Sequence, residues 1–154
     1  DYNPAVDGAL ASVSFSYDAN VFDAGDSNAV AFGALLLQGG SYYRAGFSVV
    51  FPGGWQTLSF SNLSSSDFSL ILGPGGALPD FSASGSAIQF GFWASNGTGI
   101  GQRTSTYSGI DNWQVTTVSA QPPPPVPSVP DQGGFALYAI SALALLVTAR
   151  HRRR

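Results

Sequence analysis

The sequence predicts a mainly β domain, an antiparallel β-sandwich, over residues 1–119. The 154 residues contain no Glu and no Lys but many Gly, Ser, Ala and Val, a composition that favours strands and tight turns. Short apolar stretches recur at a spacing of roughly 8–12 residues, separated by Gly and Pro, as in sandwiches and barrels. No part of residues 1–119 has a convincing helical period, so its regular structure is expected to be strand.

Each expected strand has its own local pattern. Residues 12–17 alternate small polar with large apolar side chains, as in a half-buried strand. Residues 30–38 form a more continuous apolar run, which suits a strand covered on both faces. Gly39-Gly40 and Pro52-Gly53-Gly54 mark turns between strands. The other strands are expected at residues 41–44, 47–51, 55–60, 68–72, 87–94 and 109–118.

Two further segments follow the sandwich. Residues 120–130 are rich in proline and predict an extended polyproline II linker. Residues 135–149 carry no charge and predict a helix about 22 Å long, either a short transmembrane helix or a buried core helix. The position of this segment between the linker and the basic tail 150–154 favours the transmembrane helix over the core helix. The positive-inside rule then leaves the basic tail cytoplasmic and residues 1–130 outside. The arginines of this basic anchor are Arg150, Arg152, Arg153 and Arg154.

The charge of the chain is strongly divided. Residues 1–149 hold all nine Asp of the sequence but only two basic residues, Arg44 and Arg103. Such an acidic body argues against nucleic acid as its partner, because a phosphate backbone requires a basic surface. A cytoplasmic membrane anchor explains the basic tail better than a nucleic-acid patch does.

The C-terminus resembles a known sorting signal. Val129, Pro130, Asp131 and Gly133, then an apolar helix and an arginine cluster, resemble the tripartite signal of exosortase-sorted proteins, the PEP-CTERM class and its VPDSG-CTERM relative. Gln132 stands where the VPDSG form has Ser. The resemblance covers residues 129–154 and implies a Gram-negative inner-membrane precursor whose tail a membrane-embedded exosortase processes. The body would then reach the cell envelope or the extracellular matrix, where such proteins are associated with biofilm or exopolysaccharide.

The body carries a looser resemblance. Residues 2–17, together with Gly109-Ile110-Asp111-Asn112-Trp113, are similar to concanavalin-like or carbohydrate-binding-module domains. That likeness implies a jelly-roll form of the sandwich. The likeness also implies that the first strands of the domain are missing from this sequence. Residue 1 is not Met, so we expect a signal peptide to be missing as well.

Few residues in the body suit catalysis. There is no Cys, and the only His is His151 in the basic tail, so neither a Ser-His-Asp triad nor a zinc site is expected and the chain is predicted not to be an enzyme. The one cofactor considered is a structural calcium ion, because aspartates gather in loops of the body. Its candidate ligands are Asp18, Asp23, Asp26 and Asp111. The alternative is that these are turn residues that hydrogen-bond their own backbone.

Aromatic residues offer the remaining candidate site. Sugars stack on flat aromatic rings, although most large aromatics of a sandwich fill its core. The candidates for sugar binding are Tyr42, Tyr43, Arg44, Trp93 and Trp113. The sequence therefore predicts a surface or matrix-associated protein, with a carbohydrate-binding module as the alternative. Trp93 and Trp113 exposed on one face would favour the module, and both buried would favour the matrix protein.

Overall fold

A computed structural model describes residues 1–97 and 105–120, apart from the side chain of Asp26. These residues lie in one compact unit, Asp1–Gln121. Nearly all of the predicted linker, and the whole of the sorting motif, apolar helix and basic tail, lie outside the described residues. Within the part of the chain that is described, no helix has the length and the apolar character needed to cross a bilayer.

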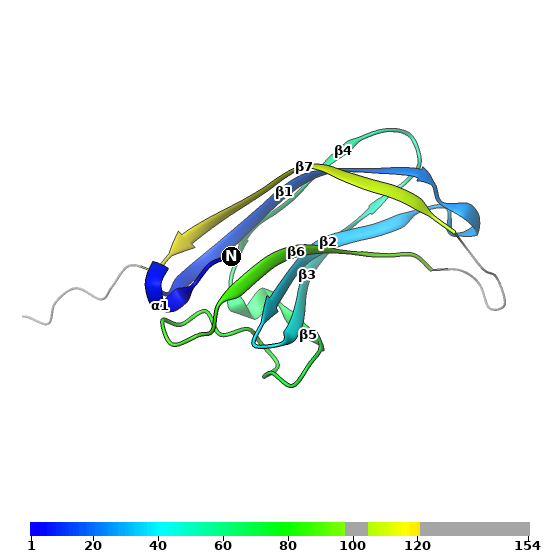
Figure 1. Cartoon of the computed structure of the whole chain (residues 1–154). Helices are drawn as coiled ribbons and strands as arrows, with labels where there is room; N and C mark the ends of the chain where they lie inside the picture. Colours follow the sequence, from blue (N-terminus) through cyan, green and yellow to red (C-terminus); the bar gives the residue numbers. More distant parts are fainter. Residues whose placement is uncertain (98–104, 121–154) are drawn as a thin grey trace, which may run out of the picture. The chain divides into compact units, whose positions relative to one another are not determined.

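Two antiparallel sheets make up the domain (Figure 1), which confirms the prediction of a mainly β structure compatible with a sandwich. The three-stranded sheet has the order β4-β1-β7, and the four-stranded sheet has the order β5-β3-β2-β6. The strands are β1 (Leu10–Asp23), β2 (Val30–Gln38), β3 (Ser41–Val50), β4 (Gln56–Leu63), β5 (Ser69–Leu72), β6 (Ile88–Ser95) and β7 (Tyr107–Ser119). Short helical turns are α1 (Pro4–Asp7), η1 (Gly25–Ser27) and η2 (Ser65–Asp67).

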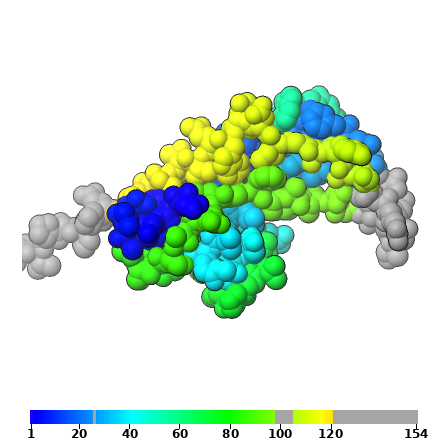
Figure 2. Space-filling model, in the orientation of Figure 1, coloured from blue at the N-terminus to red at the C-terminus, as the bar shows by residue number. Residues whose placement is uncertain are grey.

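The core lies between the two sheets, and strand alternation builds it. Phe15, Tyr17 and Ala19 of the central strand β1 are buried at every second position. From the opposite sheet, β2 contributes Phe32 and Leu36 to the same cluster. The space-filling view shows β7 lying directly along β6 on one side of the domain (Figure 2), where packed side chains close the space between the sheets.

Helix α1 is a departure from the prediction that residues 1–119 hold no helix. Asn3 caps this single turn, since its side chain accepts a hydrogen bond from the backbone N–H of Ala5, and Pro4 occupies the first helical position. Tyr2 forms a bridge with Ile88, and its hydroxyl donates a hydrogen bond to the carbonyl of Gly8 at 2.8 Å. A helix this short leaves no periodic pattern, so only its cap could have predicted it.

Strand β3 is a second departure, because residues 41–44 and 47–51 were expected to be separate strands. They form one strand with an irregular register near Gly46, which adopts a φ of 55°. A Cβ at Gly46 would lie 2.8 Å from the Phe60 ring, so glycine is required there for space as well as for backbone conformation. The bulge shifts the alternation of the strand. Arg44 and Phe47 are therefore both exposed although they are three positions apart.

Candidate functional site

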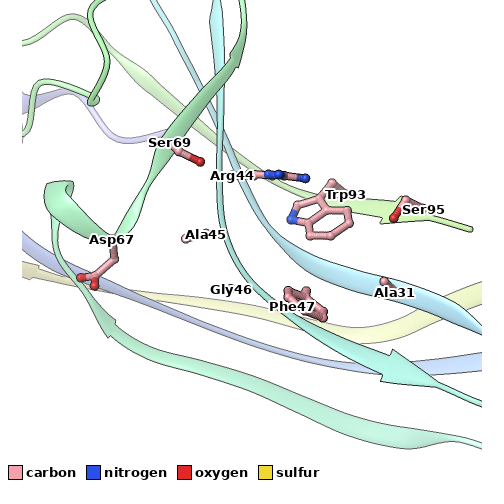
Figure 3. A pocket seen from close by; sticks show the side chains of 9 residues that line it. All are labelled: Ala31, Arg44, Ala45, Gly46, Phe47, Asp67, Ser69, Trp93 and Ser95. Atoms are coloured by element: carbon pink, nitrogen blue, oxygen red, sulfur yellow. The ribbon is translucent and has the colours of Figure 1, made fainter.

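A cavity of about 360 Å³ lies on the side of the four-stranded sheet that faces away from the core (Figure 3). Its walls come from all four strands and from η2, and its volume lies within the range of small-molecule sites. The lining residues are Ala31, Arg44, Ala45, Gly46, Phe47, Asp67, Ser69, Trp93 and Ser95. The cavity is therefore a feature of the whole sheet rather than of one loop.

Trp93 forms one wall of this cavity, and Gly33 on the neighbouring strand positions it. The two residues are paired across β2 and β6, and a Cβ on Gly33 would collide with the indole nitrogen of Trp93. Gly33 thus lets the indole lie against the sheet. The indole nitrogen is buried and has no hydrogen-bond partner in the part of the chain that the structure describes. An unpaired buried donor costs free energy, so the position of the ring is maintained by packing.

Arg44 lies beside this indole. Its guanidinium carbon is placed over the Trp93 ring, 5.5 Å from the centroid, which is a cation–π geometry, and Figure 3 shows the two groups next to each other. The Phe47 ring is 6.5 Å from the Trp93 ring. Arg44 is the only Lys or Arg among the described residues, and no described residue forms an ion pair or hydrogen bond with it. The cavity therefore contains an unpaired cation.

Polar groups complete the lining. Ser69 is directly opposite Arg44 in the pairing of β5 with β3. The hydroxyls of Ser69 and Ser95 have no hydrogen-bond partner among the described residues, so both are available to a ligand. Asp67 accepts hydrogen bonds from the hydroxyl and the backbone N–H of Ser64, at 2.7 and 2.8 Å. These two bonds, the side-chain bond first, hold the pKa of Asp67 below its usual value.

Of the residues predicted to bind sugar, the structure brings Arg44 and Trp93 together. Tyr42 is on the same side of β3 as Arg44 and is 38% exposed, but it does not line the cavity. Tyr43, another of the sugar-binding candidates, is 3% exposed and belongs to the core, so its ring is not available to a ligand. Successive strand residues face opposite sides, so Tyr42 and Tyr43 cannot share one surface.

Trp113 lies on the other side of β6 from Trp93. Its ring is 5.3 Å from Tyr17 and 6.2 Å from Phe92, at the edge where the two sheets meet. The bulge that directs it inward is at Asn112, which has a φ of 51°. The two tryptophans therefore share no face, and the arrangement matches neither alternative weighed from the sequence.

Three of the candidate calcium ligands, Asp18, Asp23 and Asp111, do not line this cavity. Asp18 and Asp111 are directly opposite each other on β1 and β7, and Asp18 accepts hydrogen bonds from Thr57 at 2.6 Å and from Asn112 at 2.6 Å. Asp23 lies five residues further along β1, roughly 16 Å away in an extended strand, and accepts a hydrogen bond from the N–H of Gly25. No group of three acidic or His side chains is gathered among the described residues, and the side chain of Asp26 lies outside them. The calcium site stays a prediction.

The sequence analysis missed Phe47, Asp67, Ser69 and Ser95 as cavity residues. For Asp67 a signal was present, because Ser64-Ser65-Ser66-Asp67 has the spacing of a capping box, and the structure contains that box around η2. For Phe47 the signal was the preceding glycine, which can introduce a bulge. Ser69 and Ser95 carry no local signal, because only strand pairing brings them to the cavity.

Comparisons with known proteins found no relative of this chain. No protein-family model, no curated protein and no solved structure matches the chain.

Proposed function

We propose that this chain is an exported protein of the cell surface or extracellular matrix whose β domain attaches to polysaccharide through the cavity around Trp93 and Arg44. The proposal joins the matrix-associated role with the carbohydrate-binding alternative, since binding to a polysaccharide is a way for a domain to be retained in a matrix. The jelly-roll form of the sandwich belongs to the same proposal, by its likeness to carbohydrate-binding modules.

The observation that supports sugar binding is the composition of the cavity. Trp93 and Phe47 supply apolar ring surface, and Arg44, Ser69 and Ser95 supply hydrogen-bonding groups without described partners. Apolar surface with a few convergent polar groups is the usual character of a small-molecule site. Saccharides present apolar C–H faces and hydroxyl groups together, so they suit such a lining.

Export and membrane attachment are proposed from the sequence alone. The motif at Val129–Gly133, the uncharged segment 135–149 and the basic tail 150–154 together make an exosortase-type enzyme the expected partner of the tail. Proline-rich residues 120–130 would hold the domain away from the membrane, at about 3.1 Å per residue. The expected location is the inner membrane for the precursor and the envelope or matrix for the processed protein.

Two experiments test the proposal. First, the full chain in an uncharged detergent is titrated with a panel of neutral and acidic polysaccharides, with Trp93→Ala as the variant and Tyr42→Ala as the control outside the cavity. We expect Trp93→Ala alone to abolish binding. A folded wild type that binds no member of the panel, or a Trp93→Ala variant that binds as wild type, contradicts sugar binding at this cavity.

The second experiment concerns export. Cells expressing the complete gene are treated with external protease after removal of the outer membrane. We expect the β domain to be degraded while a cytoplasmic marker survives. A domain that stays protected until the cells are lysed contradicts the export proposal and leaves the binding proposal to the first experiment.

A further inference from the structure

The single cation of the described surface is located inside the cavity. Eight aspartates and one arginine are present among residues 1–97 and 105–120, so the domain is acidic as a whole. In such a domain a guanidinium would be expected to pair with a neighbouring carboxylate. Arg44 does not, although it lines the same cavity as Asp67.

The two charged groups of the cavity differ in the hydrogen bonds that they already make within the protein. Asp67 accepts two hydrogen bonds from Ser64, which closes the turn of η2. Arg44 makes one described contact, a cation–π contact with the indole of Trp93, and its N–H donors have no described acceptor. A ligand in the cavity therefore meets the guanidinium of Arg44, whose N–H groups have no described acceptor, and the carboxylate of Asp67, which already accepts two hydrogen bonds from Ser64.

The position of Arg44 decides which group a ligand meets at this wall of the cavity. One side of the Trp93 indole lies toward Gly33, and the guanidinium carbon of Arg44 lies over the ring. The indole is thus partly covered, and the guanidinium is the group that a ligand meets. A guanidinium carries parallel N–H groups in a planar fork, which matches the two oxygens of a carboxylate.

We infer that the cavity selects saccharides bearing a carboxylate, so that its ligand is a polysaccharide containing uronic acid. Arg44 donates two hydrogen bonds to the carboxylate, Trp93 holds the guanidinium in plane, and Ser69, opposite Arg44 on β5, donates to an adjacent oxygen. This inference rests on the proposed function, since it names the class of saccharide that the same cavity takes.

The test uses one polymer in two forms. The full chain in uncharged detergent is titrated with polygalacturonate and with the same polymer after chemical reduction of its carboxylates to alcohols. We expect the acidic form to bind at least tenfold more tightly at about 0.15 M salt, which is the effect of a hydrogen bond to a charged group. Arg44→Gln should remove this preference, so that the variant binds the two forms with affinities within about threefold of each other.

Asp18→Asn serves as the charge control. It alters the net charge by one unit on the three-stranded sheet, outside the cavity, and we expect it to change the affinity for polygalacturonate by less than about twofold because an exposed distant charge is screened. Arg44 is exposed, so Arg44→Gln should lower the melting temperature only slightly, through the lost cation–π contact, and a cooperative melt confirms that the variant is folded.

The outcomes separate the two proposals. Equal affinity of wild type for both polymers, or an equal loss for both in Arg44→Gln, overturns carboxylate selection while sugar binding stands. Binding of a neutral polysaccharide with no binding of polygalacturonate likewise overturns carboxylate selection and leaves sugar binding standing. If no polysaccharide of the panel binds to the folded chain, both this inference and sugar binding at the cavity are wrong.

Discussion

The two sides of strand β6 use tryptophan in opposite ways. On the side that faces the other sheet, Phe92 meets Trp113, whose ring also contacts Phe15 and Tyr17. On the side away from the core, Trp93 lies against Gly33 and beneath Arg44. The inner tryptophan joins the two sheets, whereas the outer one shapes a cavity.

The two tryptophans show that the solvent exposure of a side chain does not by itself identify a binding residue. Trp113 is 38% exposed, as much as Tyr42, yet its contacts are those of a core residue at the edge of the sandwich. Trp93 is only partly exposed, yet it borders open space with an unpaired cation beside it. What surrounds the ring is more informative than how much of it meets solvent.

The largest expected effect comes from the inner tryptophan. Replacing Trp113 with Ala should lower the free energy of unfolding by about 3 kcal/mol, the low end for removing a core aromatic, because the ring is partly exposed. Replacing Trp93 with Ala should lower it by about 1 kcal/mol, through lost packing and the lost cation–π contact. Urea denaturation of both variants measures the difference. An equal loss of unfolding free energy in the two variants would contradict the different roles of the two tryptophans.

Tyr17, which packs on the inner side against Trp113, should make the stability of the domain depend on pH in the alkaline range. Burial raises the pKa of Tyr17 from 10.0 to about 12, since the side chain is 1% exposed. The folded state then holds the proton more tightly than the unfolded state does. The stability linked to this pKa shift is complete below pH 10 and is lost as the pH rises from 10 towards 12, an effect on the order of 2 kcal/mol.

Unfolding by urea across this pH window measures the effect of Tyr17, with Tyr17→Phe as the control. The control lacks the titrating hydroxyl and its hydrogen bond to the carbonyl of Gly33, so it should lose less stability as the pH rises. Wild-type and variant curves that fall in parallel would show that Tyr17 does not titrate in this way.

The outer side can be disturbed at a single glycine. In Gly33→Ala the added Cβ would collide with the indole of Trp93 and with the backbone carbonyl of Gly46. The variant should therefore displace the indole and lose about 2 kcal/mol of stability, as overpacking does. The matched control is Gly91→Ala, because a Cβ there would meet Leu35 at an ordinary 3.7 Å. Tryptophan near-ultraviolet circular dichroism should change in Gly33→Ala only, and polysaccharide binding should be lost with it. Identical spectra for both variants would mean that Gly33 does not position the indole.

The smallest effect is expected on the three-stranded sheet, away from both tryptophans. Hydrogen bonds from Thr57, and then from Asn112, hold the pKa of Asp18 below its usual 3.8. The linked stability is present above pH 3.8 and is lost as the pH falls through the lower folded value. Thr57→Val should raise the pKa of Asp18 and weaken this acid dependence, which carboxylate NMR titration would detect. An unchanged Asp18 titration in Thr57→Val would contradict it.

The strands were largely predictable because each depends on neighbours in sequence. The run at residues 30–38 became β2 with the expected bounds, and the alternation at residues 12–17 fell within the longer strand β1. The break expected between residues 44 and 47 was wrong, since a bulge at Gly46 carries β3 through it. A glycine can end a strand or bend it, and the pairing partner decides which.

The candidate site was only partly predictable, for a related reason. Arg44 and Trp93 were named because of their chemistry, but nothing in sequence order relates them. They meet because β3 and β6 both pair with β2. Ser69 enters the cavity through the same pairing network, although serine is common throughout the chain.

Composition and alternation are local properties, and they were enough to predict that the body is built of strands, that it is acidic and that few of its residues suit catalysis. Which aromatics face the core and which border a cavity depends instead on the tertiary structure. Bulges at Gly46 and Asn112 shift the alternation, and strand order sets which side chains become neighbours. Both depend on pairing between residues far apart in the chain, which local patterns do not encode.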